Sequence, residues 1–74
     1  MPMHYRLKFI DSAERTIREL NVEAESDDSA IGYTCQQSIH SNMALELWRD
    51  GELVERMTPM TARLHLPDPG ERRL

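Results

Sequence analysis

The chain has 74 residues, and 13 Asp and Glu against 9 Lys and Arg give it a formal net charge of −4. This length allows one small domain, and 30% charged with 39% hydrophobic residues is typical of a folded protein rather than a disordered one. No apolar run could cross a membrane, and the first residues lack the apolar core of a secretory signal. We therefore expect a cytoplasmic protein.

The charge pattern disfavours nucleic acid and membranes as partners. Binding to phosphates depends on clustered Lys and Arg side chains, whereas the basic residues here alternate with acidic ones. The one cysteine, Cys35, cannot form an internal disulfide, and three scattered histidines do not complete a structural zinc site with it. We expect no cofactor and no bound metal.

The first two predicted strands form a hairpin. Residues 5–9 alternate with period two, which places on one face Tyr5, Leu7 and Phe9. Asp11 and Ser12 favour the turn that follows. The second strand, predicted over about residues 15–25, has Ile17 at an odd position but its other apolar residues at even ones. A strand cannot change face without an extra residue, so we predict a β-bulge near Arg18 and Glu19.

A helix is predicted over about residues 28–40. Residues 26–29, Ser-Asp-Asp-Ser, combine candidate N-cap side chains with acids that the helix dipole favours. Asn42 is a plausible left-handed residue just after the helix. Small and apolar side chains recur at three- and four-residue spacing and form a stripe toward the sheet: Ala30, Ile31, Thr34, Cys35, Ser38 and Ile39.

The second hairpin has the clearest pattern in the sequence. Two alternating segments within residues 43–57 flank Asp50-Gly51, a signal for a two-residue turn. A type I′ turn would pair Trp48 with Leu53, whereas a three-residue loop would pair Leu47 with Leu53. With the type I′ turn, Glu46 and Glu55 would face each other on the outer side, and three side chains would point to the helix: Leu45, Leu47 and Val54.

Together these elements predict an α+β fold: an antiparallel four-stranded sheet in β-β-α-β-β order with one helix packed on one face. Residues 1–60 are expected to form this single domain. Residues 61–66 alternate weakly and predict either a short edge strand or a partner-dependent arm. Residues 61–74 as a whole are expected to be a flexible C-terminal arm, since Pro, Gly and charge dominate their second half.

The predicted core is small, which favours association. Its candidates are Tyr5, Leu7, Phe9, Ile17, Leu20, Val22, Ile31, Cys35, Ile39, Leu45, Leu47 and Val54. A chain of this size without a disulfide or metal often gains stability from a partner. We predict a homodimer, formed through an edge strand or through an apolar patch of Trp48, Leu53, Ile10 and Met57 on the helix-free face. Alternatively, Trp48 covers the end of the sheet in a monomer.

No arrangement of residues predicts catalysis. Cys35 could act as a nucleophile with His4, His40 or His65 as base, but it falls on the apolar stripe of the helix, which favours a buried structural role. Glu46 and Glu55 could form a carboxylate pair with one raised pKa, but a small open sheet offers no cleft around them. We predict that the chain is not an enzyme.

Two stretches of the sequence are similar to known proteins. Residues 5–11, Tyr-Arg-Leu-Lys-Phe-Ile-Asp, and residues 44–54, which contain the Glu-Leu-Trp hairpin, resemble short uncharacterised proteins of alphaproteobacteria, including relatives of rhizobia. The resemblance covers roughly residues 4–57. It implies a bacterial cytoplasmic origin and a compact β-β-α-β-β unit, and it assigns no activity to any residue.

The favoured function is a non-catalytic protein-interaction module that self-associates. The alternative is a small-ligand-binding or regulatory domain with a pocket between helix and sheet near Tyr5, Tyr33 and Cys35. A third hypothesis, an antitoxin-like role in contact with DNA, would require four basic side chains to converge on one surface: Arg6, Lys8, Arg15 and Arg18.

Overall fold

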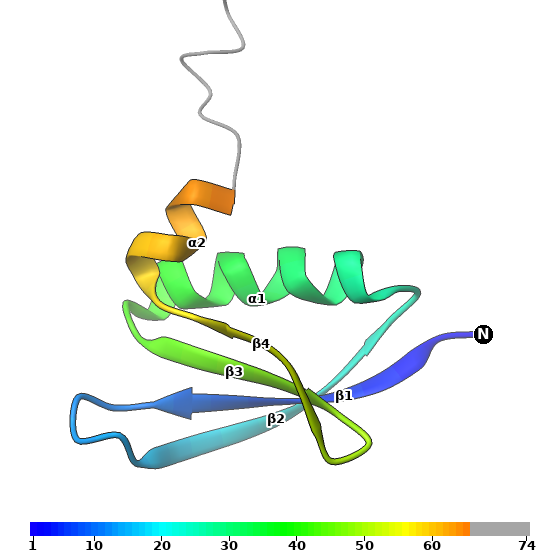
Figure 1. Cartoon of the computed structure of the whole chain (residues 1–74), viewed down its shortest axis with the longest axis horizontal. Coiled ribbons are helices and arrows are strands. Elements are labelled where there is room, and N and C mark those ends of the chain that lie inside the picture. Colours follow the sequence, from blue (N-terminus) through cyan, green and yellow to red (C-terminus); the bar gives the residue numbers. More distant parts are fainter. Residues whose placement is uncertain (66–74) are drawn as a thin grey trace, which may run out of the picture.

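The computed structural model describes residues 1–65 of the chain. Four strands form one antiparallel sheet in the order β2-β1-β3-β4, and helix α1 lies across one face (Figure 1). The predicted α+β fold is therefore confirmed. The elements are β1 (Met3–Ile10), β2 (Thr16–Ala24), α1 (Asp27–Ser41), β3 (Ala44–Arg49), β4 (Glu52–Met57) and α2 (Pro59–His65).

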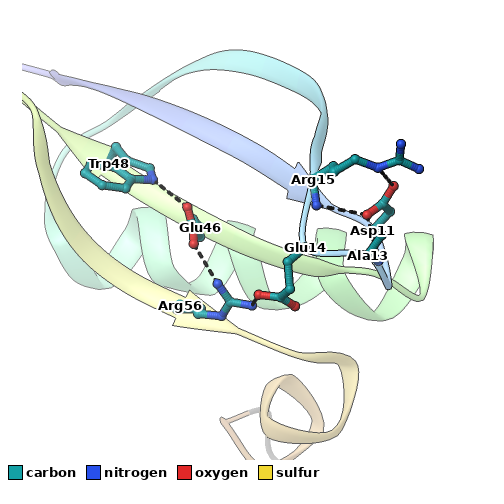
Figure 2. Close-up of polar contacts among 7 residues, drawn as sticks. All are labelled: Asp11, Ala13, Glu14, Arg15, Glu46, Trp48 and Arg56. Atoms are coloured by element: carbon teal, nitrogen blue, oxygen red, sulfur yellow. Dashed lines mark hydrogen bonds and ion pairs between the residues drawn. The ribbon is translucent and has the colours of Figure 1, made fainter.

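A short turn joins β1 to β2 and is built around Asp11. Its carboxylate Oδ1 accepts hydrogen bonds from the backbone N–H groups of Ala13 and Arg15, both at 2.9 Å (Figure 2). This bonding is the reason that Asp favours turns, so the predicted turn is confirmed. Glu14 adopts a left-handed φ of 63° there.

The first hairpin contains a bulge at Ile17. Phe9 pairs with Arg18 and Ile10 pairs with Thr16, so Ile17 is the extra residue of β2. The predicted bulge exists, one residue before the predicted place. Ile17 itself is 58% exposed, so its assignment to the core is wrong. An inserted residue has no partner in the ladder, and its side chain is free to point to solvent.

Helix α1 begins and ends as the capping pattern predicts. Ser26 is the N-cap, with its hydroxyl accepting the N–H of Ser29 at 3.2 Å, and Asn42 is the left-handed C-cap with φ 57°. Two hydroxyl groups on the stripe are buried, and both are satisfied by carbonyl oxygens. Thr34 Oγ1 donates to the carbonyl of Ala30 at 2.8 Å, and Ser38 Oγ donates to that of Met43 at 2.6 Å. The helix can therefore pack closely on the sheet without an unpaired polar group on this stripe.

The β3–β4 hairpin has the predicted type I′ turn. Both Asp50 and Gly51 have positive φ, 52° and 79°, and Trp48 pairs with Leu53. The register then shifts by one residue, so that Leu47 pairs with Glu55 and Val54 becomes a bulge.

This shift changes the partner of Glu46, which stands opposite Arg56. The predicted facing of Glu46 and Glu55 is wrong, because the bulge turns Glu55 to the helix side of the sheet. The two carboxylates therefore lie on different faces and form no acid–base pair.

The buried side chains form two clusters. The larger lies between α1 and the sheet and comprises Tyr5, Leu7, Phe9, Ala30, Leu45 and Leu47. Five further predicted core residues are partly buried against these clusters: Leu20, Val22, Ile31, Ile39 and Val54. The smaller cluster joins Cys35 of α1 to Met57 and to Ala62 of α2.

Residues 61–65 belong to helix α2, so the edge strand, one of the two alternatives considered for residues 61–66, does not form in the part that is described. Thr58 starts this helix: its hydroxyl accepts the N–H of Thr61 at 3.3 Å, and its carbonyl accepts the N–H of Ala62 at 2.8 Å. Pro59 follows at a position where proline is favoured in helices. The predicted flexible segment from residue 66 onward lies outside the described residues.

Two members of the predicted apolar patch are not exposed. Met57 is 0% exposed because it pairs with Leu45 on the helix side of the sheet and is covered by α2. Ile10 is 5% exposed. The predicted exposure of Ile10 and Met57 is wrong, and the patch is reduced to Trp48, which is half-buried, and Leu53, which is 48% exposed.

Candidate functional site on the outer face and edge of the sheet

The face of the sheet opposite α1, here called the outer face, carries polar and charged side chains around one tryptophan. The ladder pairs Arg6 with Trp48 and Lys8 with Glu46 on the two central strands. On the flanking strands the same pairing adds Glu19, Asn21 and Glu23 from β2, and Leu53 and Arg56 from β4. Trp48 is the only tryptophan in the chain.

A chain of polar contacts fixes the indole ring of Trp48. Its Nε1–H donates to Oε1 of Glu46 at 3.1 Å, and the other oxygen of Glu46 accepts from Arg56 at 2.7 Å. Arg56 also contacts Glu14 in the β1–β2 turn at 2.8 Å. Figure 2 shows these four side chains as one line across the outer face. The Glu46 side chain is only 17% exposed, so its two bonds hold the ring in one orientation.

The ammonium group of Lys8 lies over the indole of Trp48, with Nζ 4.7 Å from the ring centroid. Such a cation–π contact is favourable because the ring face carries negative charge density. Beside this pair is an open groove of about 340 Å³, called the outer groove, which is lined by His4, Tyr5, Arg6, Lys8, Asn21, Trp48, Asp50 and Gly51. Of the residues predicted to surround a pocket, Tyr5, Tyr33 and Cys35, only Tyr5 lines this groove.

Cross-strand ion pairs border the outer groove along β2. His4 Nδ1 lies 3.4 Å from Glu23, and Arg6 lies 3.3 Å from Glu19. All four side chains are substantially exposed, so each pair contributes little to stability. As a result, the carboxylates of Glu19 and Glu23 follow the β2 side of the groove, and His4 and Arg6 belong to its lining.

A second polar cluster ties α1 to the sheet. The Tyr5 hydroxyl donates to Oδ1 of Asp27 at 2.6 Å, and Arg49 donates to the same oxygen. The hydrogen bond from Tyr5, with further help from Arg49, lowers the pKa of Asp27. Burial, followed by the bond to Asp27, raises the pKa of Tyr5. These contacts join the first turn of α1 to two strands that are distant in sequence.

Acid should weaken this cluster. A carboxyl group with a lowered folded-state pKa stabilises the fold while ionised. Its contribution is complete well above its usual pKa of 3.8 and disappears as pH falls below that value through the lower folded-state pKa.

Urea unfolding near pH 6 and pH 3 should therefore show a larger loss of stability for the wild type than for D27N, which keeps the side-chain shape. The matched control D28N, which removes the neighbouring exposed charge, should lose as much as the wild type. Equal losses for all three proteins would contradict this role.

Cys35 is a buried structural cysteine, as its position on the helix stripe predicted. The side chain packs with Met57 and Ala62 between the two helices and the sheet. Burial, with a smaller effect of the Glu55 charge, raises the pKa of the thiol. A raised pKa lowers the fraction of nucleophilic thiolate at neutral pH, so the environment of Cys35 is opposite to that of a reactive cysteine.

Strand β2 forms a free edge of the sheet. It is nine residues long, and no element of the described chain lies beyond it in the sheet order (Figure 1). From Arg18 to Ala24 its pairing with β1 has no register shift. The other edge, β4, is shorter, contains the bulge at Val54 and leads directly into α2.

The four basic side chains of the DNA hypothesis do not converge. Arg6 and Lys8 lie on the outer face, whereas the guanidinium of Arg18 lies 5.5 Å from the ring of Phe9, on the helix side. Arg15 pairs with Asp11 within the turn at 3.3 Å. The condition that this hypothesis requires is therefore not met.

Within residues 1–65 the side chains of His, Cys, Asp and Glu form no group of three that could hold a metal ion. None of the described helices has the length and apolar character needed to span a membrane. Comparisons with protein families, with curated proteins and with solved structures gave no match. The resemblance to short alphaproteobacterial proteins therefore stays a prediction.

Proposed function

We propose that this chain is a non-catalytic protein-interaction module that self-associates by pairing β2 with β2 of a second copy. The observation that carries the proposal is the free, regular edge of β2. Backbone N–H and C=O groups along an edge strand lack partners within the sheet, and they can bind another strand of the same kind.

Strand β2 carries some of the features that protect edges, the charged side chains of Arg18, Glu19 and Glu23, but lacks others. Between Thr16 and Ala24 there is neither proline nor lysine, and the bulge at Ile17 interrupts only its first residues. Partly buried Leu20 and Val22 point to the helix side at the border of the core. Antiparallel pairing about a two-fold axis perpendicular to the sheet would place the same residues of a second copy beside them and cover them further.

The outer face is the weaker route to a dimer. With Ile10 and Met57 buried, its apolar side chains are reduced to Trp48 and Leu53, and charged residues surround both. A stable interface buries roughly 800 Å² on each partner, which two such residues do not supply. Strand pairing leaves the outer face open to solvent in both copies.

A lysine on the edge tests the proposal. Ile17 lies on β2 with 58% exposure, and Leu64 lies on α2 with 80% exposure, so I17K and L64K add the same charge at exposed apolar positions. We expect wild type and L64K to show, at high concentration, twice the 8.6 kDa mass of the chain. The I17K dimer should dissociate at a protein concentration about tenfold higher than the wild-type dimer does, because lysine on an edge strand opposes pairing. Light scattering across a concentration series measures both masses.

Two outcomes would contradict the proposal. The first is a wild-type mass of one chain at every concentration. The second is a dimer that I17K and L64K weaken equally, which would move the interface away from β2. Circular dichroism of each variant checks that the exposed substitutions leave the fold unchanged.

A further inference from the structure

We propose that the outer groove binds a small anion attached to a planar body, with Lys8 and Arg6 holding the anionic group and Trp48 contacting the body. This inference is independent of self-association, because strand pairing at β2 leaves the outer face open. It assigns a ligand class to a site that neither the sequence motifs nor the proposed function requires.

The unusual position of Lys8 is the first observation. In the two ladders Lys8 stands opposite Glu19 and opposite Glu46, yet within residues 1–65 its ammonium forms an ion pair with neither. Glu19 is bound by Arg6, and Glu46 is bound by Arg56 and by the indole N–H. The ammonium instead lies over the indole, at the groove. Its positive charge is thus available to a ligand.

The groove is also more positive than the protein that carries it. Among its lining residues Arg6 and Lys8 are basic and Asp50 is acidic, with His4 beside them, whereas the chain as a whole has a net charge of −4. Arg6 uses one nitrogen for Glu19 at 3.3 Å, and a guanidinium has five N–H donors. Arg6 and Lys8 are therefore the groups that would bind a carboxylate or phosphate.

The size and border of the groove select a small ligand. A volume of about 340 Å³ is at the lower end of small-molecule sites. The carboxylates of Glu19 and Glu23 on β2 and of Glu46 on β3 flank the cations, and they would repel the repeated phosphates of a nucleic acid. A ligand with one anionic end and an uncharged planar body meets this repulsion only once, and its body covers Trp48, whose ring is held in place by Glu46.

Fluorescence of Trp48, the only tryptophan, reports binding directly. Benzoate and phenyl phosphate are the probes, and benzamide is the neutral control of the same shape. We expect both anions to change the emission with dissociation constants in the millimolar range, and benzamide to bind about tenfold more weakly. The stronger of the two anions identifies carboxylate or phosphate as the preferred group.

Variants locate the site. K8Q should weaken binding of the better anion about fivefold, K8R should retain it, and R63Q, which removes an exposed charge on α2, should leave it unchanged. The I17K variant, in which self-association is expected to be weaker, should bind like the wild type. The proposal is overturned if neither anion binds, if benzamide binds as well as benzoate, or if K8Q and R63Q have equal effects.

Discussion

Replacement of Leu7 by alanine is expected to lower the free energy of unfolding by about 3–4 kcal/mol. Leu7 is fully buried at the centre of the sheet, paired with Leu20 on one side and with Leu47 on the other, and α1 covers this face. The shortened side chain would leave a cavity that two flanking strands and a helix cannot close. Because small domains have a total stability of about 5 kcal/mol or more, L7A would be close to unfolding.

The same chemical change at an exposed site provides the control. Leu53 lies on β4 and is 48% exposed, so L53A should cost less than about 1 kcal/mol. Urea unfolding followed by far-ultraviolet circular dichroism gives both values. If L7A and L53A cost the same, Leu7 is not at the centre of the core.

Replacement of Ala62 by glutamate is the second large expected effect, a loss of at least about 3 kcal/mol. Ala62 has no exposed surface and lies against Cys35 and Met57, where α2 meets α1. A glutamate there must either bury a charge or separate α2 from the rest of the fold. In the second case Met57 also loses the cover that α2 gives it.

The control for this substitution lies in the same helix. Leu64 is 80% exposed, so L64E introduces the same side chain and charge at a solvent-facing position of α2. It should change stability by less than about 0.5 kcal/mol. An A62E variant as stable as L64E would mean that residues 59–65 do not pack on α1.

Local signals in the sequence were sufficient for most of the fold. Ser26 and Asn42 mark the two ends of α1, because each satisfies backbone groups at a helix end. Asp50 and Gly51 form the two-residue turn, because both can adopt the positive φ that it requires. The apolar residues change from an odd position at Ile17 to even positions after it, and this change predicted a bulge. It could not reveal that Ile17 itself is the inserted residue and points to solvent.

Helix α2 was absent from the sequence-based prediction for a physical reason. Residues 61–66 alternate weakly, and seven residues are too few for helix propensity alone to form α2. The Thr58-Pro59 start was the available local signal, and the decisive contact is tertiary: Ala62 against Cys35 and Met57. Alternation alone placed Met57 on the outer face; the bulge at Val54 moves it to the helix side, where the same contact buries it.

The outer groove depends on the strand order, which local periodicity does not contain. Alternation placed Arg6 and Lys8 opposite the apolar face of β1, as observed. Their proximity to Trp48 follows from the pairing of β1 with β3, a contact between hairpins rather than within one. The bulge at Val54 likewise brings Arg56 to Glu46, and so fixes the indole.

Amide hydrogen exchange at two protein concentrations tests most directly whether β2 is the self-association edge. If two copies pair through β2, outward-facing amides between Arg18 and Ala24 should exchange more slowly at the higher concentration, where the dimer forms. Amides of β4, the other edge, should exchange at the same rate in both samples. Concentration-independent exchange along β2, or slowing confined to β4, would contradict the proposed pairing.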